Sequence, residues 1–377
     1  LERGLALAPG ALPLRVNKAR ALRMLERDDE ALTILLDCLR DDPEAPGVEN
    51  LVGNIFMDRG ELDRAEEHFR NALAVEPNST GALLSKGLLA ERRGRIAEAL
   101  ESYQQVAEID PDSSEAFSNI GNLFRAQALQ LRSAGDREAA TVMFQRAEAA
   151  YEDGLAADPD FIGTYNNLAL LYQDTGRHEE AMALYRRALE RDPDNAVVHN
   201  NLGSLYFTAG LLDDARLHFE RAIAEDTGYA AAYNTLGAVL GRLGRSDDEL
   251  ESYRKAVDLD PDYADGHHNL GLALARRGDL PGAEKALRRA IELQGDYLSA
   301  LATLGDLYLR QGRPGEAIPL FQRALEVNPS LFGIRNQLAE ALLATGDRQE
   351  GIAEFRRSLE MQPEQPGVEQ RLSELED

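Results

Sequence analysis

The sequence predicts an all-α fold, a solenoid of about ten helix–turn–helix units, and three observations lead to that prediction. Prolines recur at a constant interval, as at Pro9, Pro43 and Pro77, which are each 34 apart. Glycines keep the same interval, as at Gly176 and Gly210. Between these markers, apolar residues lie three and four apart, which is the spacing of one helix face. A fixed period of about 20 to 50 residues is the signature of stacked repeats.

Each position of the repeat has a physical role, which the unit after Pro159 illustrates. The segment NLALLYQDTG predicts a helix that ends at Gly176, because the cap position favours a left-handed backbone. A second amphipathic helix, HEEAMALYRRALERD, follows and stops at Pro193, since proline cannot continue the helical hydrogen bonds. Small residues such as Ala181 let the two helices approach, and the ring of Tyr185 fills the adjacent groove. One pair cannot bury its own apolar stripe, so neighbouring pairs must stack.

Composition and charge narrow the classes of partner. The chain has 377 residues, 44% of them apolar, and a net charge of −25. Nucleic acids and anionic membrane surfaces demand a basic face, so this charge argues against both as partners. No apolar run approaches the length that spans a bilayer, and we therefore expect no membrane insertion.

These residues resemble the tetratricopeptide repeat family. The segment NNLGSLYFTAG, followed by Ala215 and Phe219, matches the family pattern closely, as do IGNLF at 120–124 and LGDLY at 304–308. The resemblance covers essentially the whole chain and implies a right-handed α-solenoid (a superhelix) that binds a protein or peptide. The ten complete units are expected to begin near Leu12, Pro46, Thr80, Ser114, Ile162, Ala196, Ala230, Ala264, Leu298 and Phe332.

The domain organisation follows from this phase of the repeat. Residues 1–9 are expected to be the remnant second helix of a truncated repeat, and 10–363 the array itself. Residues 364–377 are expected to form a polar capping helix, because the end of a solenoid must be soluble.

One unit, residues 114–161, is longer than the others. The prolines at 111 and 159 lie 48 apart, which is 34 plus 14, and this predicts seven extra residues in each helix of an extended hairpin over 125–147. Heptad insertions keep the facing stripe in register, so that Ala128 and Leu131 can still seal against Ala140 and Met143. We expect Leu129 and Val142 to be exposed near the tip. The hairpin is either a harmless extension or a docking finger formed by Leu129, Leu131, Val142 and Met143.

The resemblance implies that the first helix of each unit lines a concave groove. Asparagine recurs at the fifth and sixth positions of these helices, although it is a poor helix-interior residue. A ladder of amides would suit a peptide main chain, and similar asparagine ladders occur in O-linked N-acetylglucosamine transferases; the alternative is that these residues only support the fold. The predicted peptide-binding groove consists of Asn166, Asn167, Leu170, Gln173, Asn200, Asn201, Ser204, Phe207, Asn234, Arg242, His268 and Asn269.

Nothing in the sequence points to catalysis. We find no GxSxG, no HExxH, no phosphate-binding loop and no paired cysteines, and therefore predict no catalytic residue, no metal and no cofactor. His267 and His268 lie beside Asp265, but His267 occupies a packing position of the repeat. Glu249 stands where other units have Ala or Gly, which requires either an arginine partner or a splayed hairpin.

Three functions remain open at this stage. The first is a non-catalytic interaction scaffold that binds a protein or peptide in the groove. The second is the substrate-recognition or regulatory arm of a larger enzyme encoded upstream of Leu1. The third is self-association, through the extended hairpin or one end of the array.

Overall fold

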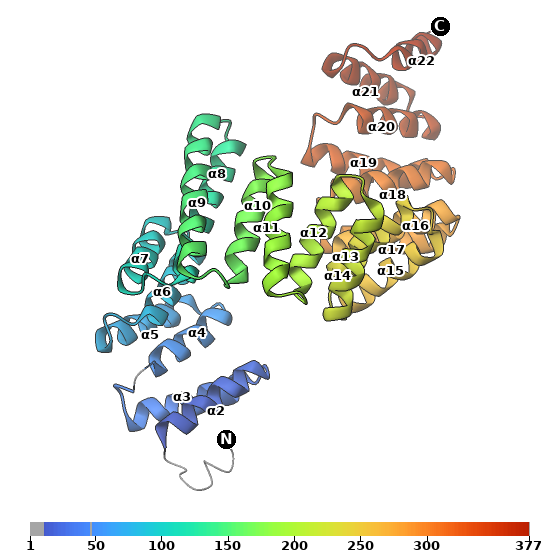
Figure 1. The fold of residues 1–377 in the computed structure, drawn as a ribbon. Coiled ribbons are helices and arrows are strands. Elements are labelled where there is room, and N and C mark those ends of the chain that lie inside the picture. Colours follow the sequence, from blue (N-terminus) through green and yellow to red (C-terminus); the bar gives the residue numbers. More distant parts are fainter. Residues whose placement is uncertain (1–10, 46, 377) are drawn as a thin grey trace. The chain divides into compact units, whose positions relative to one another are not determined.

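A computed structural model describes residues 11–45 and 47–376 of the chain (Figure 1). The described residues form 21 helices and no strands, which confirms the predicted all-α class. The remnant helix expected at 1–9 lies outside the described residues. None of the described helices is both long enough and apolar enough to span a membrane.

The chain divides into two compact units, the first ending at Pro193 and the second beginning at Asp194. The helices pair in order along each unit. In the first unit the pairs are α2 (Leu12–Met24) with α3 (Asp28–Asp41), α4 (Val48–Asp58) with α5 (Leu62–Val75), α6 (Thr80–Arg92) with α7 (Ile96–Ile109), α8 (Ser114–Ser133) with α9 (Arg137–Ala157), and α10 (Ile162–Asp174) with α11 (His178–Arg191).

The second unit repeats the same pairing and adds one helix. Its elements are α12 (Ala196–Thr208) with α13 (Leu212–Glu225), α14 (Ala230–Arg242) with α15 (Ser246–Leu259), α16 (Ala264–Arg277) with α17 (Leu280–Leu293), α18 (Leu298–Arg310) with α19 (Pro314–Val327), α20 (Phe332–Thr345) with α21 (Arg348–Met361), and α22 (Pro366–Glu376).

The helix starts follow the predicted phase of the repeat with one exception. The unit expected to begin near Pro46 has its first helix, α4, starting at Val48. The residue before it, Gly47, is in the left-handed region with φ of 69°, so the chain turns there before the helix begins.

In each typical pair, a large side chain of the second helix packs against a glycine of the first helix. In the α14/α15 pair, a Cβ placed on Gly237 would lie 2.7 Å from the Tyr253 ring, so only glycine lets that ring lie flat against the helix. Gly203 and Phe219 have the same relationship in the α12/α13 pair. In both pairs the ring follows the glycine by 16 positions along the sequence.

The long hairpin has the same contact between a glycine and a ring, with a larger separation along the sequence. Gly121 of α8 faces Tyr151 of α9, 30 positions later, which is 14 more than in the other pairs. α8 has 20 residues and α9 has 21, against 13 and 14 in α10 and α11. Each arm is therefore seven residues longer, about two turns, which confirms the predicted lengthening.

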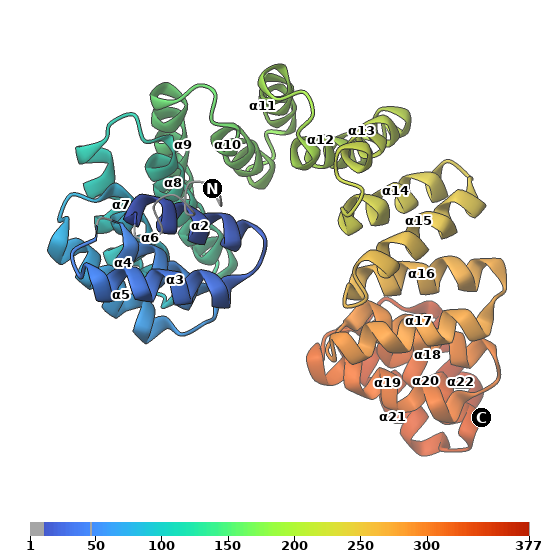
Figure 2. The same cartoon turned by 90° about the horizontal axis from the view of Figure 1, so that it is seen from below.

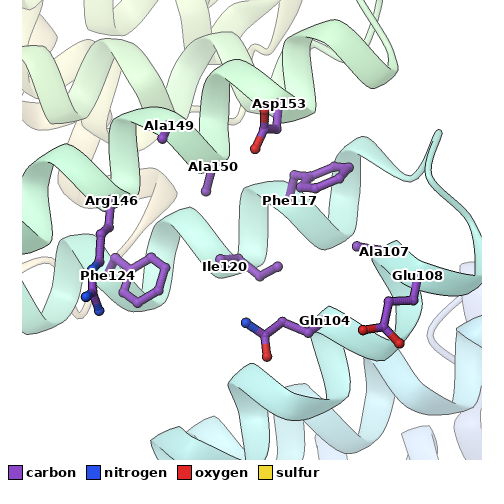
Figure 3. A pocket seen from close by; sticks show the side chains of 10 residues that line it. All are labelled: Gln104, Ala107, Glu108, Phe117, Ile120, Phe124, Arg146, Ala149, Ala150 and Asp153. Carbon is purple, nitrogen blue, oxygen red and sulfur yellow. The ribbon is translucent and has the colours of Figure 1, made fainter.

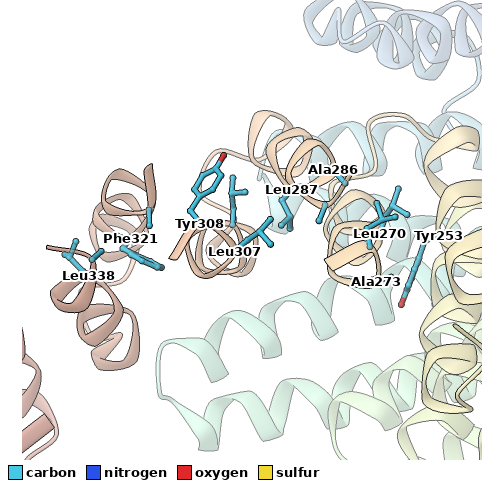
Figure 4. Close-up of a cluster of buried hydrophobic side chains, with 14 of the residues drawn as sticks. Tyr253, Leu270, Ala273, Ala286, Leu287, Leu307, Tyr308, Phe321 and Leu338 are labelled. Atoms are coloured by element: carbon cyan, nitrogen blue, oxygen red, sulfur yellow. The ribbon is translucent and has the colours of Figure 1, made fainter. Parts of the chain in front are cut away.

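Apolar side chains from successive pairs make up the core of each unit. In the second unit, one cluster runs from Tyr253 through Leu270 and Leu287 to Tyr308 and Phe321 (Figure 4). Within each unit, every first helix after the opening one thus packs on the second helix before it as well as on its own partner. This continuity is what lets short helix pairs bury their stripes.

Glu249 stands where other repeats have a small residue, and an ion pair and a glycine on the facing helix accommodate it. Glu249 is only 5% exposed and pairs with Arg276 of α16. Opposite it lies Gly241, where a Cβ would be 2.5 Å from the Glu249 carboxylate. The small residue is therefore on the facing helix, and the hairpin closes around a paired carboxylate.

The last helix covers the apolar end of the second unit. α22 lies beside α21 (Figure 2). Leu372 of α22 is 7% exposed and packs with Ala339 of α20 and Phe355 of α21. The outward residues of α22, such as Glu369 and Ser373, are exposed.

Candidate functional site

The first helices of the second unit form a row in which each is next to the following one, from α12 through α14, α16 and α18 to α20. Hydrogen bonds between polar side chains connect neighbouring helices of this row. They join the fifth residue of one pair to the sixth residue of the next, so the partners are always 35 apart in sequence.

Three such contacts follow one another. Thr235 Oγ1 donates to Asn200 Oδ1 at 3.5 Å, and Asn269 Nδ2 donates to Asn234 Oδ1 at 3.0 Å. His268 Nε2 lies 3.4 Å from Thr303 Oγ1. We call these six side chains, Asn200, Asn234, Thr235, His268, Asn269 and Thr303, the polar ladder.

Asn234 is the buried centre of the ladder. Its side chain is 7% exposed, its Oδ1 accepts from Asn269, and its Nδ2 donates to Tyr263 Oη at 3.3 Å. An amide that is buried and bonded on both atoms serves to hold helices together, because leaving it unpaired would cost free energy. Asn234 therefore supports the fold, which was one of the two sequence interpretations.

Asn200 and Asn269 are half-buried and have hydrogen-bonding capacity left. An amide group offers two N–H donors and two acceptor lone pairs. The bonds of Asn200 are one donated to Asn201 Oδ1 at 3.4 Å and one accepted from Thr235. These two side chains can each still bind a main-chain group of a partner.

His268 adds a neutral ring to the ladder. It is 9% exposed, and burial lowers its pKa below the ordinary value, while nearby Asp265 acts in the opposite direction. The ring of Tyr297 lies against it, with centroids 5.1 Å apart. At neutral pH His268 is therefore an uncharged donor or acceptor and packs against an aromatic ring.

The remaining predicted groove residues of this unit lie on α12 and α14. Asn201 and Ser204 are half-buried, and the Ser204 hydroxyl donates to Asn200 O of its own helix at 3.0 Å. Arg242 lies over the Phe207 ring, 4.9 Å from its centroid. The same arginine donates to Phe207 O at 3.4 Å, so this pair connects α14 to α12.

The other four predicted groove residues belong to the first unit. Asn166, Asn167, Leu170 and Gln173 are half-buried on α10. Gln173 Nε2 donates to Tyr185 Oη at 2.9 Å, which ties α10 to its partner helix.

The long hairpin is more closely joined to its neighbour than the sequence suggested. Arg132 Nη1 donates to Asp174 O at 2.6 Å, and Arg125 bonds the Asp174 carboxylate at 2.6 Å, so α8 is tied to the end of α10. Leu129 was expected to be exposed and is half-buried, which corrects that prediction. Val142 is 42% exposed, as expected.

The facing stripe of the hairpin is closed. Ala128 and Ala140 are buried, and Leu131 and Met143 are half-buried. At the base of the hairpin, a pocket of about 660 Å³ lies among α7, α8 and α9 (Figure 3). Phe117, Ile120 and Phe124 line it, with Arg146 beside the Phe124 ring.

The histidines considered for metal binding have separate partners. His267 Nε2 lies 3.0 Å from Pro261 O, while His268 contacts Thr303. Within residues 11–45 and 47–376, no three or more His, Cys, Asp or Glu side chains are grouped so that they could hold a metal ion. Cys38 is fully buried, and burial raises the pKa of its thiol.

Family models for the tetratricopeptide repeat match most of this architecture. One matches residues 53–114, 200–264 and 302–366, about half of the chain, and a second matches 160–225 and 262–330. The chain belongs to the tetratricopeptide repeat family. Proteins of this family generally mediate protein–protein interactions as scaffolds and are generally non-catalytic.

Solved structures agree on the fold. The chain is similar to pilF of Pseudomonas aeruginosa, with a TM-score of 0.51 and 20% identity over 56% of this chain and 97% of that one. It is also similar to a monomeric mutant of IFIT1 with m7Gppp-AAAA, with a TM-score of 0.53 and 16% identity over 84% of this chain and 78% of that one. At these identities the likeness shows the fold alone. A comparison with curated proteins found no match.

The sequence predicted the fifth-position residues of the ladder and one of their partners, Asn269, but not the other two. Thr235 and Thr303 were not predicted as site residues, although they form two of the three contacts. A search for polar residues separated by one position more than the repeat length would have found them, because each contact joins the fifth position of one repeat to the sixth position of the next.

Proposed function

We propose that this protein is a non-catalytic interaction scaffold, and that the polar ladder of its second unit binds an extended segment of a partner protein. The observation that carries the proposal is the regular recurrence of half-buried amides and hydroxyls along α12, α14, α16 and α18. A partner's main chain repeats its own donors and acceptors irrespective of sequence, so a regular ladder suits it.

Repetition is needed for affinity in this proposal. Each hydrogen bond contributes only about 1 kcal/mol net, so several contacts along the ladder must act together. Existing bonds within the ladder favour this, because they fix the side chains before the partner arrives and lower the entropy lost on binding.

The charges beside the ladder do not select a strongly charged segment. Arg276 is paired with Glu249, and Arg310 with Asp306 at 2.8 Å. Because these arginines are already paired, we expect recognition by main-chain hydrogen bonds with little dependence on salt.

The test begins with peptides selected from a random displayed library on the wild-type protein. Their dissociation constants are then measured on a variant with Asn200→Ala and Asn269→Ala. We expect binding at least about tenfold weaker, because two amides that face the segment are removed. Asn234→Ala is not used, since that side chain supports the fold. Asn269→Ala removes the donor to Asn234 Oδ1, so circular dichroism must first show that the double variant is folded.

Two controls make the result specific. A variant with Asn71→Ala and Gln322→Ala removes two exposed amides from second helices and should bind as the wild type does. Peptides with methylated main-chain nitrogens should bind more weakly than their parents. Selected peptides that bind both double variants equally, or that tolerate methylation throughout, would show that the ladder is not the binding site.

A further inference from the structure

A cavity of the second unit lies among α15, α16 and α17, apart from the ladder, and we call it the outer pocket. Its volume is about 660 Å³. Leu270, Leu274 and Ala286 supply its apolar lining, and Arg254 and Lys285 are among its charged residues. A concave site of several hundred Å³ with apolar walls and a few polar groups has the composition of a binding site.

A group of three side chains that closes two other repeats is missing here. In the next repeat, Tyr308 Oη donates to Glu284 at 2.8 Å, and Arg313 lies 4.3 Å from the centre of the Tyr308 ring. Arg313 also bonds Glu284 at 2.8 Å, and this hydrogen bond is the main reason that the pKa of Glu284 falls to about 2. The Tyr308 ring, the Arg313 guanidinium and the Glu284 carboxylate together fill this part of the repeat.

The first unit closes the corresponding position with the same three residue types. Tyr172 Oη donates to Glu148 at 2.9 Å, and Arg177 lies 3.8 Å from the ring centre and bonds Glu148 at 2.7 Å. Two repeats far apart in sequence therefore use one arrangement.

All three positions have different residues in the repeat of the outer pocket, and two of them, Leu274 and Asp279, line the cavity. One repeat before Tyr308, Arg313 and Glu284, the equivalent residues are Leu274, Asp279 and Leu250. A leucine is shorter than a tyrosine, and Asp279 is engaged at the start of α17, where its Oδ1 accepts from Gly282 N at 3.0 Å. The space that a ring and a guanidinium fill elsewhere is consequently open.

The pocket is also positively charged, in a chain whose net charge is −25. Four cationic side chains line it against two carboxylates. Arg288 and Arg289 have acidic partners, Glu284 at 3.1 Å and Asp262 at 2.7 Å. Among the described residues, Arg254 and Lys285 take part in no hydrogen bond or ion pair, so they are available to an anionic group from outside.

We propose that the outer pocket docks an acidic segment of a partner protein, with a leucine or phenylalanine side chain against Leu270 and Leu274 and carboxylates at Arg254 and Lys285. A purely ionic ligand would leave the apolar lining uncovered, and a purely apolar ligand would leave the two cations unpaired. A ligand with both kinds of group therefore fits best. Charge complementarity would also speed the encounter at low salt.

The test uses a fluorescein-labelled peptide with the repeated pattern Glu-Leu-Phe-Glu, and its binding is followed by fluorescence anisotropy. We expect the variant with Arg254→Glu and Lys285→Glu to bind at least about tenfold more weakly, because two charge-assisted contacts are reversed. Both side chains are exposed, so folding should be unaffected. Leu274→Tyr should also weaken binding, because it places a ring where Tyr172 and Tyr308 stand in two other repeats.

Matched controls separate this pocket from the protein's general charge. A variant with Arg221→Glu and Lys255→Glu makes the same charge change on exposed residues of α13 and α15 and should bind nearly as the wild type does. Peptides with Lys in place of Glu, or Ala in place of Leu and Phe, should bind far more weakly.

Several outcomes would overturn the proposal. The lysine peptide could bind as tightly as the acidic one, or both pocket variants could retain wild-type affinity. Pyrophosphate or a single-stranded oligonucleotide could bind at this pocket while the acidic peptide does not, which would make it a site for phosphates. None of these results depends on the polar ladder, so the two proposals can fail separately.

Discussion

At the scale of the residue, contacts between a glycine and a larger side chain decide how closely the two helices of a pair pack. Gly237 leaves room for Tyr253, and Gly241 leaves room for Glu249. The two glycines lie one turn apart on α14, yet one admits a ring and the other a paired carboxylate. The same physical need, the absence of a Cβ, therefore serves an apolar and a polar contact.

The first prediction concerns Gly237. Gly237→Ala should destabilise the protein by about 1–3 kcal/mol, because the new methyl group would overlap the buried Tyr253 ring and force it to move. Urea unfolding followed by circular dichroism measures the effect.

Gly333→Ala is the matched control. Gly333 lies near the start of α20, where an added Cβ would meet nothing within 4 Å. Alanine restricts the unfolded chain more than glycine does, so this change should be neutral or stabilising by up to about 1 kcal/mol. Equal losses in the two variants would mean that the contact with Tyr253 is not what requires glycine.

At the scale of the element, the long hairpin shows why insertions in a repeat come in matched lengths. Seven residues added to one arm alone would leave a stripe without a partner. Seven added to both arms leave Gly121 facing Tyr151, and Ala128 and Ala140 buried in the extension. The extension is therefore a removable part of an otherwise ordinary pair.

The prediction at this scale is a paired deletion. Removing 127–133 together with 137–143 should leave a pair of ordinary length, with Ala147 in the small-residue position before Tyr151. The shortened protein should stay folded, with a slightly lower unfolding midpoint because the bond from Arg132 to Asp174 is lost. Circular dichroism and urea unfolding would show this.

Deleting only 127–133 is the control, and it should be far more damaging because one arm then has no facing helix. If the paired and single deletions unfold alike, the two arms do not act as a matched insertion. The role of this hairpin as a docking finger stays a prediction. A partner that binds the wild type and loses affinity for the folded paired deletion would support it.

Sequence reasoning predicted these elements well because each repeat position has a local cause. Gly176 follows one helix in the left-handed conformation and Pro193 follows the end of the next, both through their own backbone preferences. The longer interval from Pro111 to Pro159 was visible as a change of period. The turn at Gly47 shifted one helix start, since the 34-residue phase that placed the start near Pro46 contains no information about that turn.

The sites were harder to predict, because they depend on relations between repeats. Reading position by position found Asn234 and could not show that Asn269 and Tyr263 engage its amide. The outer pocket was missed for a similar reason. Leu274 is an ordinary core residue in its own repeat, and only comparison with Tyr308 shows that a closing ring is absent.

At the scale of the whole molecule, the repeat pattern does not mark the division into two units. The first helices start 34 residues apart on both sides of Pro193, at 162, 196 and 230, while the contacts fall into two groups on either side of it. Each unit has its own buried clusters, one around Phe56 and Phe69 in the first and one around Leu287 and Phe321 in the second. A repeat protein can be cut where neighbouring pairs meet more safely than inside a pair, because the strongest packing is within the pair.

We therefore expect residues 194–377 to fold when expressed alone. The fragment keeps the packing contacts of Gly203 with Phe219 and of Gly237 with Tyr253, together with the covering helix α22. A fragment of 212–377 is the control, since it removes α12 and leaves Phe219 without its facing helix. Both are compared by circular dichroism and limited proteolysis. We expect 194–377 to resist cleavage throughout and 212–377 to be cut first within α13. An unfolded 194–377, or equal protection of α13 in both fragments, would show that the pair is not the unit of stability in this chain.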